Sequence, residues 1–522
     1  MKRIIAAALI CLAFACSNEQ KEAAPEISLF ENYRAQDFKP MIHYSPDSAW
    51  MNDPNGMVYY DGEYHLFFQF YPDSTVWGPM HWGHAVSEDM VHWEHLPIAL
   101  YPDELGYIFS GSAVIDWNNT TGLQTGEHPP MIAIFTHHAP KGAADKNNIV
   151  YQYQSIAYSN DKGRTWTKYE GNPVIPNPGI EDFRDPKVFW NKEAKLWAMI
   201  LAAADRIKIY TSPNLIDWKD QSEFGANNGA HGGVWECPDL FPLQVEGSNE
   251  VKWVLLLSIN PGGPNGGSAT QYFVGDFDGK TFTTDQEETL WLDHGRDNYA
   301  GVTWSDIPEE DGRRLFIGWM SNWNYGQQVP SKRWRSAMTL PRSLHLVKNK
   351  LYEVESRPVA EISTLENESE IIIVNSEIVS QDVQPLGDAT KTELTFDLKA
   401  TTANKFGFEL QNDNGETYQF GYDKERGILF SNRIEAGDHS FNDDFGKVLH
   451  IAPYTTSNDL MTFEIYLDRA SVEVFINNGQ RVMTELVFPS SPFTAASVFF
   501  TGGDAEVVAL KNTPLKSIWR NQ

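Results

Sequence analysis

Three acidic residues stand in short motifs that each place a carboxylate close to a proline. The motifs are Trp50-Met51-Asn52-Asp53-Pro54-Asn55-Gly56, Phe183-Arg184-Asp185-Pro186 and Trp235-Glu236-Cys237-Pro238-Asp239. A single Asp-Pro pair is usually an ordinary turn former. Three acids at equivalent points of an internal repeat would instead crowd negative charge, which costs stability unless a function uses it. We therefore take Asp53, Asp185 and Glu236 as candidate catalytic groups.

Two close carboxyl groups are the minimum equipment for cleaving a glycosidic bond. One donates a proton to the leaving oxygen, and the other attacks the anomeric carbon or activates water. A third can stabilise the positive charge of the transition state or hold sugar hydroxyls. Glu236 follows Trp235, whose apolar ring could raise the pKa of the carboxyl and so favours Glu236 as the acid. The cation of Arg184 should keep its neighbour Asp185 ionised.

The elements that must position these acids are short strands. Beyond Pro40, runs rich in Val, Ile, Tyr, Phe and Trp alternate with turn residues, and no long amphipathic helix is found, which predicts an all-β fold. A pattern of apolar strand, polar turn and aromatic residue recurs over residues 85–93, 157–166, 209–218 and, more weakly, 273–282. Units of four strands over roughly 50 to 75 residues are typical of propeller blades.

The repeat predicts a five-bladed β-propeller over residues 40–345. Its first strands should begin near Asp53, Ser110, Asp185, Glu236 and Tyr299. The innermost strand of each blade lines the central axis, so side chains at the mouths of these strands should converge on one funnel. From residue 355 to residue 522 a polar-apolar alternation takes over, and it predicts a C-terminal β-sandwich.

The N-terminus has the pattern of a bacterial export signal. Lys2 and Arg3 precede an apolar run over residues 4–15, which predicts a signal peptide over residues 1–15. The run is too short to cross a membrane as a helix. Cys16 follows Ala15 as in a lipoprotein cleavage site, so we expect lipidation of Cys16, a polar tether over residues 16–39 and an exported protein anchored at the cell envelope. Plain secretion or a periplasmic location is the alternative.

The charge balance excludes several kinds of partner. The 522 residues carry 41 Lys and Arg against 70 Asp and Glu, a formal net charge of −29, which disfavours nucleic acid and anionic membrane surfaces. We expect a neutral ligand, and contact with a membrane only through the lipid anchor. Cys237 is the only thiol outside the leader, so no internal disulfide is possible. The histidine spacings match no zinc signature, so we expect no metal and no cofactor.

Together, and in this order, the three acidic motifs resemble the defining motifs of glycoside hydrolase family 32, the invertases, inulinases and levanases. The resemblance covers the folded body, because that family joins a five-bladed propeller to a β-sandwich. It implies that Asp53 is the nucleophile, Asp185 the transition-state stabiliser and Glu236 the acid/base of a retaining β-fructosidase. The substrate would be a fructan, such as levan or inulin, or sucrose.

The same resemblance implies a set of substrate-binding residues. By similarity, the fructosyl unit would be bound by Asn52, Gln69, Ser110 and Arg184, and an aromatic rim would be formed by Trp50, Trp77 and Phe109, with Trp319 as a further sugar contact. Gln69 is followed by Phe70-Tyr71-Pro72, where the family often has Tyr or His and then Asn-Pro. This departure leaves the catalytic set untouched.

Several other functions are compatible with parts of this pattern. A fructosyltransferase or an endo-acting fructanase could use the same fold, and an inverting arabinan-type hydrolase is disfavoured by the first motif and by the sandwich. A non-catalytic glycan-binding propeller needs no nucleophile, so the three acids argue against it. The segment from Trp319 to Trp323 looks more like exo-acting enzymes, so we expect exo action. The sequence indicates neither the preferred linkage nor the oligomeric state.

Overall fold

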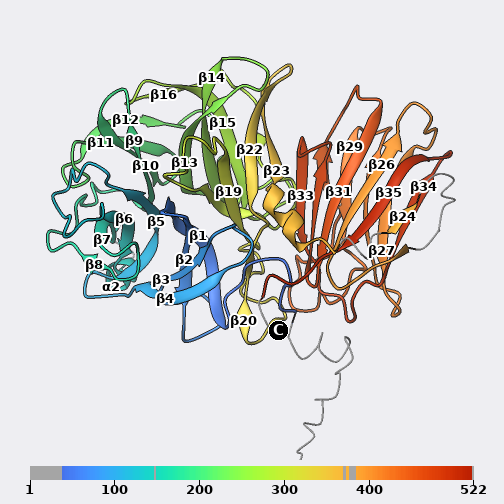
Figure 1. The fold of residues 1–522 in the computed structure, drawn as a ribbon, viewed down its shortest axis with the longest axis horizontal. Helices are drawn as coiled ribbons and strands as arrows, with labels where there is room; N and C mark the ends of the chain where they lie inside the picture. Colours follow the sequence, from blue (N-terminus) through green and yellow to red (C-terminus); the bar gives the residue numbers. More distant parts are fainter. Residues whose placement is uncertain (1–37, 146–147, 368–371, 375–383, 520–522) are drawn as a thin grey trace, which may run out of the picture.

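The computed structural model describes residues 38–145, 148–367, 372–374 and 384–519. Five sheets surround a common axis in the N-terminal part, coloured blue to yellow in Figure 1, and two packed sheets follow in orange and red. The prediction of a five-bladed β-propeller followed by a β-sandwich is therefore confirmed. The predicted signal peptide and the lipidation site Cys16 lie outside the described residues. Among the described residues, no helix has the length and the apolar character needed to cross a membrane.

Each of the first three propeller sheets has four strands that follow one another along the chain, and a short parallel strand, β20 (Trp334–Arg335), joins the first. Their bounds are β1 (Ala49–Tyr60), β2 (Glu63–Tyr71), β3 (His81–Ser87) and β4 (Glu94–Leu100); β5 (Tyr107–Ile115), β6 (Met131–His138), β7 (Gln152–Ser159) and β8 (Thr167–Lys168); β9 (Phe183–Asn191), β10 (Leu196–Ala203), β11 (Ile207–Ser212) and β12 (Lys219–Phe224).

The fourth and fifth sheets complete the circle. The fourth contains β13 (Val234–Gln244), β14 (Val251–Asn260), β15 (Ala269–Phe277), β16 (Phe282–Thr283) and β17 (Leu290–Trp291), and the fifth contains β18 (Tyr299–Thr303), β19 (Arg314–Met320), β21 (Ala337–Met338), β22 (Arg342–Lys348) and β23 (Tyr352–Pro358). The first strands β1, β5, β9, β13 and β18 contact one another in a closed ring around the axis. This is the funnel that the sequence predicts.

The fifth sheet ends later than expected, because it continues to Pro358 rather than to residue 345. Leu344 and Val354 of β22 and β23 pack against Phe241 of the fourth sheet, so this hairpin belongs to the propeller. The strand, turn and aromatic pattern that marks the other blades is missing here. The alternation of this hairpin therefore resembles that of the sandwich that follows.

The repeated sequence pattern forms the turns between the third and fourth strands of the blades. In three of these turns a serine hydroxyl bonds the Asp or Asn two residues later, as in Ser87 to Asp89 (3.0 Å), Ser159 to Asp161 (2.7 Å) and Ser212 to Asn214 (3.2 Å). The Asp or Asn side chain then accepts backbone N–H groups further along, which closes the turn. In these three blades the repeat is therefore a local hydrogen-bonded turn that ends the third strand.

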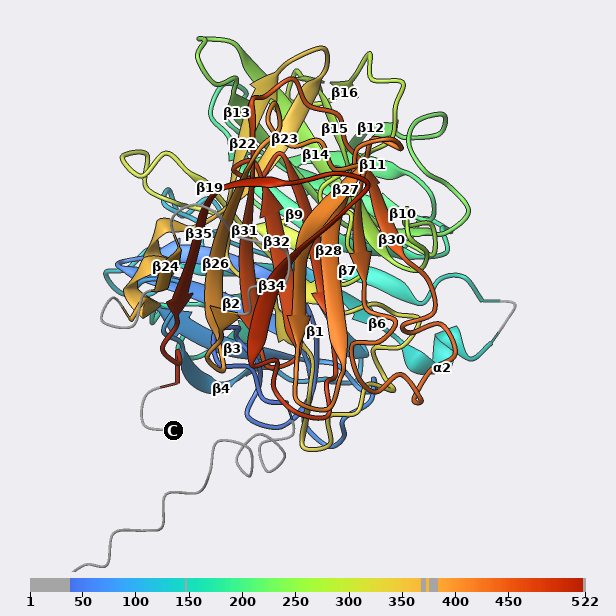
Figure 2. The same cartoon turned by 90° about the vertical axis from the view of Figure 1, so that its right-hand side faces the viewer.

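The sandwich has two six-stranded antiparallel sheets, which face the viewer in Figure 2. One contains β24 (Ile372–Val374), β35 (Glu506–Pro514), β26 (Thr390–Asp397), β31 (Leu460–Asp468), β32 (Ser471–Ile476) and β33 (Arg481–Leu486), and the other contains β25 (Gln384–Pro385), β34 (Ala495–Thr501), β27 (Lys405–Gln411), β28 (Thr417–Asp423), β29 (Ile428–Asn432) and β30 (His450–Pro453). In β26 every second side chain is buried, including Leu394 and Phe396. The alternation read from the sequence thus has one face in the core.

Buried ion pairs join the sandwich to the propeller. Arg342 of β22 pairs with Asp293 of the propeller (3.0 Å) and with Glu473 of β32. His43 contacts Asp468 and Glu473 at 2.8 Å each. Burial lowers the pKa of His43, but hydrogen bonds to the two carboxylates outweigh burial and raise this pKa to about 9. The interface therefore contains charges whose partners come from both domains.

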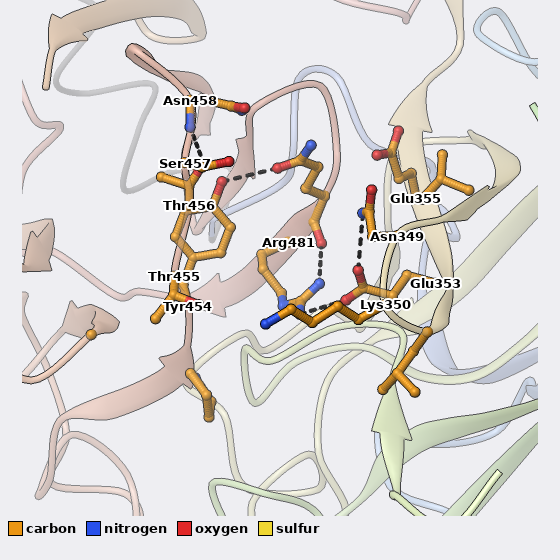
Figure 3. A pocket seen from close by; sticks show the side chains of 15 residues that line it. Asn349, Lys350, Glu353, Glu355, Tyr454, Thr455, Thr456, Ser457, Asn458 and Arg481 are labelled. Carbon is orange, nitrogen blue, oxygen red and sulfur yellow. Dashed lines mark hydrogen bonds and ion pairs between the residues drawn. The ribbon is translucent and has the colours of Figure 1, made fainter.

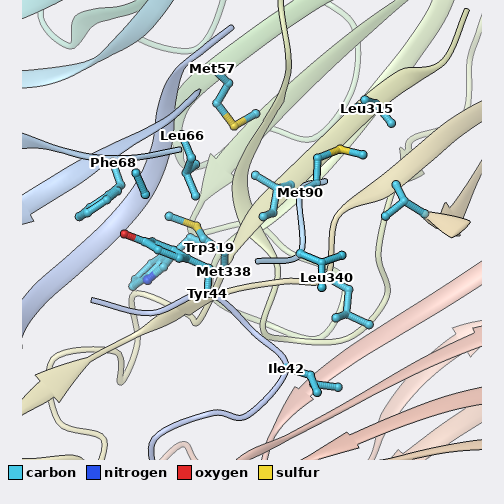
Figure 4. Packing of buried hydrophobic residues seen from close by; sticks show 14 of the residues in the cluster. Ile42, Tyr44, Met57, Leu66, Phe68, Met90, Leu315, Trp319, Met338 and Leu340 are labelled. Carbon is cyan, nitrogen blue, oxygen red and sulfur yellow. The ribbon is translucent and has the colours of Figure 1, made fainter. Parts of the chain in front are cut away.

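An apolar cluster also crosses this interface. Figure 4 shows part of it, where Ile42, Met57, Leu66, Trp319 and Leu340 lie together. The same cluster includes Tyr466, Phe475 and Val482, which are sandwich residues. Trp50 and Trp319 also belong to this cluster, so the residues that pack around the funnel and the domain interface share one hydrophobic core.

Candidate active site

Five equivalent residues form a ring at the mouth of the funnel. Each stands on an innermost strand directly before a proline or a glycine: Asp53, Ser110, Asp185, Cys237 and Ala300, which we call the ring residues. In all five strands the pairing register shifts at this point, as in a β-bulge. Asp185, Cys237 and Ala300 have positive φ angles of 65°, 46° and 53°. A bulge bends a strand and redirects its side chains, so this repeated irregularity places the ring.

Glu236 is not a ring residue, which corrects the expectation that the three acids occupy equivalent points. It precedes Cys237, so it is out of phase by one residue with Asp53 and Asp185. Its equivalents in the other blades are Asn52, Phe109, Arg184 and Tyr299. The site therefore has two layers, one of ring residues and one of the residues that precede them.

The Asp53 carboxylate accepts hydrogen bonds from three side chains. Asn52 Nδ2 donates to Oδ1 at 2.9 Å, Ser110 Oγ donates to Oδ2 at 2.9 Å, and Cys237 Sγ lies 3.5 Å from Oδ2. Burial, with a further contribution from the negative charge of Glu236, raises the pKa of Asp53, while these hydrogen bonds oppose the rise. Asp53 is thus fixed in orientation in a site that it shares with a second carboxyl.

Asp185 lies on the same ring beside Cys237. The Cys237 backbone N–H donates to Asp185 Oδ2 at 3.0 Å, and the Cys237 thiol lies 3.6 Å from the same oxygen. Burial raises the pKa of Asp185 to about 7 even though the charge of Arg184 lowers it. Arg184 lowers the pKa of Asp185, as the sequence suggests, but the desolvation of the buried carboxylate has the larger effect and raises it.

Glu236 is held between a cation and a phenol. Arg184 donates to Glu236 Oε1 from Nη2 (2.9 Å) and Nε (3.2 Å), and the Tyr299 hydroxyl donates to Oε2. The Trp235 ring is expected from the sequence to lie against the Glu236 carboxyl, but it packs elsewhere. The ring is fully buried in a cluster that includes residues of the third and fourth sheets, and its indole N–H donates to the Ala230 carbonyl (3.0 Å).

Sequence reasoning missed Tyr299 and Cys237 as members of the site. The available signal was the fivefold repeat itself, in which Glu236-Cys237-Pro238 and Tyr299-Ala300-Gly301 are equivalent. Burial and the charge of Glu236 raise the pKa of Tyr299 well above its usual value, so its hydroxyl stays protonated. Tyr299 can therefore serve Glu236 as a lasting hydrogen-bond donor.

The predicted sugar-binding residues divide into exposed and buried groups. Trp77 is 37% exposed and its ring centroid lies 6.1 Å from that of Phe109, so these two form an aromatic rim. Trp50 and Trp319 are fully buried, and Trp50 donates to Asn52 Oδ1 (2.8 Å), so Trp50 lies behind the ring rather than on the rim. Its aromatic neighbours in the core explain this position.

Two buried donors near this layer have no protein acceptor among the residues that the structure describes. They are Gln69 Nε2 and Trp319 Nε1. Buried N–H groups are nearly always hydrogen-bonded, so an orphaned donor calls for a partner. Hydroxyl oxygens of a sugar have the required chemistry. No cluster of three or more His, Cys, Asp or Glu side chains suited to a metal ion occurs within the described part of the chain.

The space beneath the ring is almost filled. A cavity of about 10 Å³ lies there, lined by Pro54, Ser110, Gly111, Asp185, Pro186, Lys187, Cys237, Pro238 and Val302. This is about the volume that one water molecule requires. Lys187 pairs with buried Asp239 at 3.0 Å below it. The axis of the propeller is thus closed at the ring, and a sugar can reach the acids from one side only.

A much larger cavity, of about 750 Å³, lies away from these acids. Figure 3 shows it between Asn349, Lys350 and Glu353 of the propeller and the sandwich segment from Tyr454 to Asn458. The hairpin between β22 and β23 lines it, at the end of the fifth sheet opposite Tyr299. None of the ring residues lines this cavity, so it is separate from the acidic site.

Comparison with known proteins matches nearly the whole folded body. Residues 43–356 match the glycosyl hydrolases family 32 N-terminal domain, and residues 361–514 match the glycosyl hydrolases family 32 C-terminal domain. A levanase of Bacillus subtilis (strain 168) is 49% identical over 495 residues, which cover 94% of this chain and 72% of the levanase. An extracellular exo-inulinase of Aspergillus awamori is 40% identical over 518 residues, which cover 93% of this chain and 96% of the relative.

Solved structures agree with these matches. The crystal structure of the exo-inulinase from Aspergillus awamori superposes with a TM-score of 0.87 at 38% identity, covering 93% of this chain and 99% of the other. A β-fructofuranosidase from Schwanniomyces occidentalis complexed with fructosyl-erythritol has a TM-score of 0.83 at 31% identity, covering 92% of this chain and 98% of the other.

Proposed function

This chain belongs to glycosyl hydrolase family 32, and we propose that it is a retaining β-fructosidase that removes terminal fructose from fructans and sucrose. The observation that carries the proposal is that the two carboxyl groups at the ring, those of Asp53 and Glu236, are held by different partners. Asp53 is fixed by three donors, whereas Glu236 contacts Arg184 and the Tyr299 phenol. Glycosidases need two carboxyls in different environments because one must attack while the other carries a proton.

The first step breaks the glycosidic bond. An oxygen of ionised Asp53 attacks the anomeric carbon of the terminal fructose, and Glu236 gives its proton to the departing oxygen. The products of this step are a fructosyl ester of Asp53 and the rest of the substrate, which leaves with the glycosidic oxygen as a hydroxyl group. The Tyr299 hydroxyl can donate to ionised Glu236 and accept from protonated Glu236, whereas the guanidinium of Arg184 can only donate. Tyr299 is therefore suited to both protonation states of the acid.

The second step returns the enzyme to its starting state. Glu236 takes a proton from a water molecule, the water oxygen bonds to the anomeric carbon, and the ester bond to Asp53 breaks. Two inversions give net retention at the anomeric carbon. In this assignment Asp185 holds sugar hydroxyls, and Asn52, Gln69, Ser110, Arg184 and Trp319 supply further polar contacts, with Trp77 and Phe109 against the faces of the sugar.

Exo action is the form of hydrolysis that we propose. The support is the similarity to a relative named an extracellular exo-inulinase, which is 40% identical over 518 residues. We expect early time points on levan, inulin and sucrose to yield free fructose without intermediate oligosaccharides. Chromatography of timed samples measures this. Oligosaccharides in the first samples would indicate endo action, and longer products at high sucrose would indicate a fructosyltransferase.

We also propose that the mature protein is anchored to the cell envelope through Cys16. The support is the charged and apolar leader with a small residue directly before Cys16. A single lipid-modified terminus with several acyl chains gives stable anchoring, whereas one chain gives only marginal binding. In detergent phase partitioning, Cys16→Ala should move fructosidase activity to the aqueous phase while turnover stays unchanged. Equal partitioning of the variant and the natural protein would refute the anchor.

A further inference from the structure

Residues 322–328, which we call the rim segment, contact the aromatic core behind the catalytic ring. The Trp323 ring centroid lies 6.0 Å from that of Trp50 and 4.9 Å from that of Trp319. Trp50 donates to Asn52, which in turn donates to Asp53. A chain of direct contacts therefore leads from the rim segment to the Asp53 carboxylate.

The rim segment also contacts the exposed side of the mouth. Gln327 Oε1 accepts the backbone N–H of Trp77 at 3.2 Å. Trp77 is the exposed member of the aromatic rim. One segment thus touches both the buried tryptophans behind the ring and the tryptophan at the entrance. The position of the rim segment therefore sets the distance between the buried tryptophans Trp50 and Trp319 and the exposed Trp77.

The sandwich holds the rim segment from the other side. In the loop 438–445, Asn442 Nδ2 donates to the Asn324 carbonyl at 3.0 Å and to Gln328 Oε1 at 2.6 Å. Asn324 Nδ2 donates back to Asp444 Oδ2 at 3.1 Å. These three hydrogen bonds join two loops that are far apart in the sequence. None of their residues is part of the catalytic ring.

A buried cation of the sandwich anchors the middle of the rim segment. Arg433 donates to the Tyr325 hydroxyl (2.8 Å) and to Asp297 Oδ2 (2.6 Å), and Tyr325 donates to Asp297 Oδ1 (2.7 Å). Arg433 also lies 4.0 Å from the ring centroid of Phe445. Arg433, Tyr325 and Asp297 are almost completely inaccessible to solvent. A closed triangle of this kind allows the Tyr325 side chain little freedom.

We propose that the C-terminal sandwich positions the rim segment and thereby sets the affinity of the active site for its fructan, with Asn442 as the accessible positioning residue. The inference rests on the proposed function, because it assumes that the mouth binds a sugar chain. The sandwich then does more than cover one side of the propeller. It fixes the relation between the entrance at Trp77 and the core behind Asp53.

Asn442→Ala tests this proposal, because it removes two hydrogen bonds to the rim segment from a partly exposed loop. We expect the KM for inulin or levan to rise roughly 3- to 10-fold while kcat changes less than about 2-fold. Amide hydrogen exchange over residues 322–328 should become faster in the absence of any substrate. Asn414→Ala is the matched control, because Asn414 Nδ2 donates to Ser490 and Ser491 within the sandwich. This control should leave both measurements unchanged.

The two readouts separate the possible failures. Unchanged KM and unchanged exchange in Asn442→Ala would overturn the proposal, and so would faster exchange spread evenly over the sandwich with a matching loss of kcat. If the natural protein released no fructose from any fructan or sucrose, the proposed function would fail instead. The exchange measurement would still report whether the sandwich positions the rim segment. Arg433→Lys, which keeps the charge and loses the forked donor, should shift exchange in the same segment.

Discussion

Replacement of Asp53 by Ala should lower kcat on sucrose and fructans by on the order of 10⁴- to 10⁶-fold, the range observed when a covalent nucleophile is removed. The expected loss follows from the ring, where Asp53 is oriented by Asn52, Ser110 and Cys237. Asp185 is held by the Cys237 backbone instead and is assigned to the sugar hydroxyls. Steady-state release of fructose measures the loss.

Asp306 supplies the matched control for this change. It is a partly buried aspartate whose pKa is raised to about 6, but it follows the far end of β18 and accepts from Ile115 N–H and Trp117 Nε1. Asp306→Asn should leave kcat within about 3-fold of the natural enzyme, since its hydrogen-bond partners Ile115 and Trp117 lie at the end of β5 and beyond it, away from the ring. Asp53 would lose its assignment if its Ala variant kept more than about 1% of normal turnover, or if the first fructose released had the inverted anomeric configuration.

Asp185→Asn should make the protein less active and more stable. Its loss of activity should be about 10²- to 10³-fold in kcat, the range for a group that stabilises transition-state charge or holds the reacting sugar. The gain in stability follows from burial, which raises the pKa of Asp185 to about 7 from an ordinary 3.8. Between these two values the folded state binds a proton that the unfolded state has released.

The sign of the pH dependence follows directly. Because the unfolded state binds fewer protons in this window, the contribution of Asp185 to the free energy of unfolding decreases as the pH rises from about 4 to about 7. Asparagine cannot ionise, so the variant loses that cost. We expect its Tm to exceed that of the natural protein by roughly 2–4 °C above about pH 7, and to equal it below about pH 4. Calorimetry at both pH values decides the matter, and a Tm difference independent of pH would contradict the assignment of this titration to Asp185.

Local rules account for the parts of the fold that the sequence predicts well. The Ser87-Glu88-Asp89 turn and its copies close through their own side chains, so their spacing reveals the blades before any tertiary contact is known. The alternation in β26 likewise needs only one buried face. The sequence predicts an end of the propeller at residue 345, which leaves out the end of β22 and all of β23, because the membership of the β22–β23 hairpin depends on packing against Phe241, which no local pattern encodes.

The sequence predicted that the three acids of the candidate site would meet at one funnel, but it predicted their electrostatic surroundings less well. Motif order identified Asp53, Asp185 and Glu236, and the structure brings all three to one funnel. The adjacency of Arg184 and Asp185 in the sequence suggested an ion pair, yet the Arg184 guanidinium bonds Glu236 across the blade boundary. Tyr299 escaped attention because its carboxylate partner lies 63 residues earlier in the chain. Neighbours across blades follow from ring closure, which a linear pattern does not contain.

The five bulged positions imply an economical route by which this architecture can change its chemistry. The five ring residues stand at the same register shift of their strands and carry different side chains, although only Asp185, Cys237 and Ala300 have positive φ angles. The backbone shape is specified by the following proline or glycine rather than by the group that faces the axis. Duplicated blades can therefore diverge one side chain at a time, each new group arriving at the centre already aimed. A change of chemistry at the ring therefore needs only single substitutions at these five positions and no change of the propeller backbone.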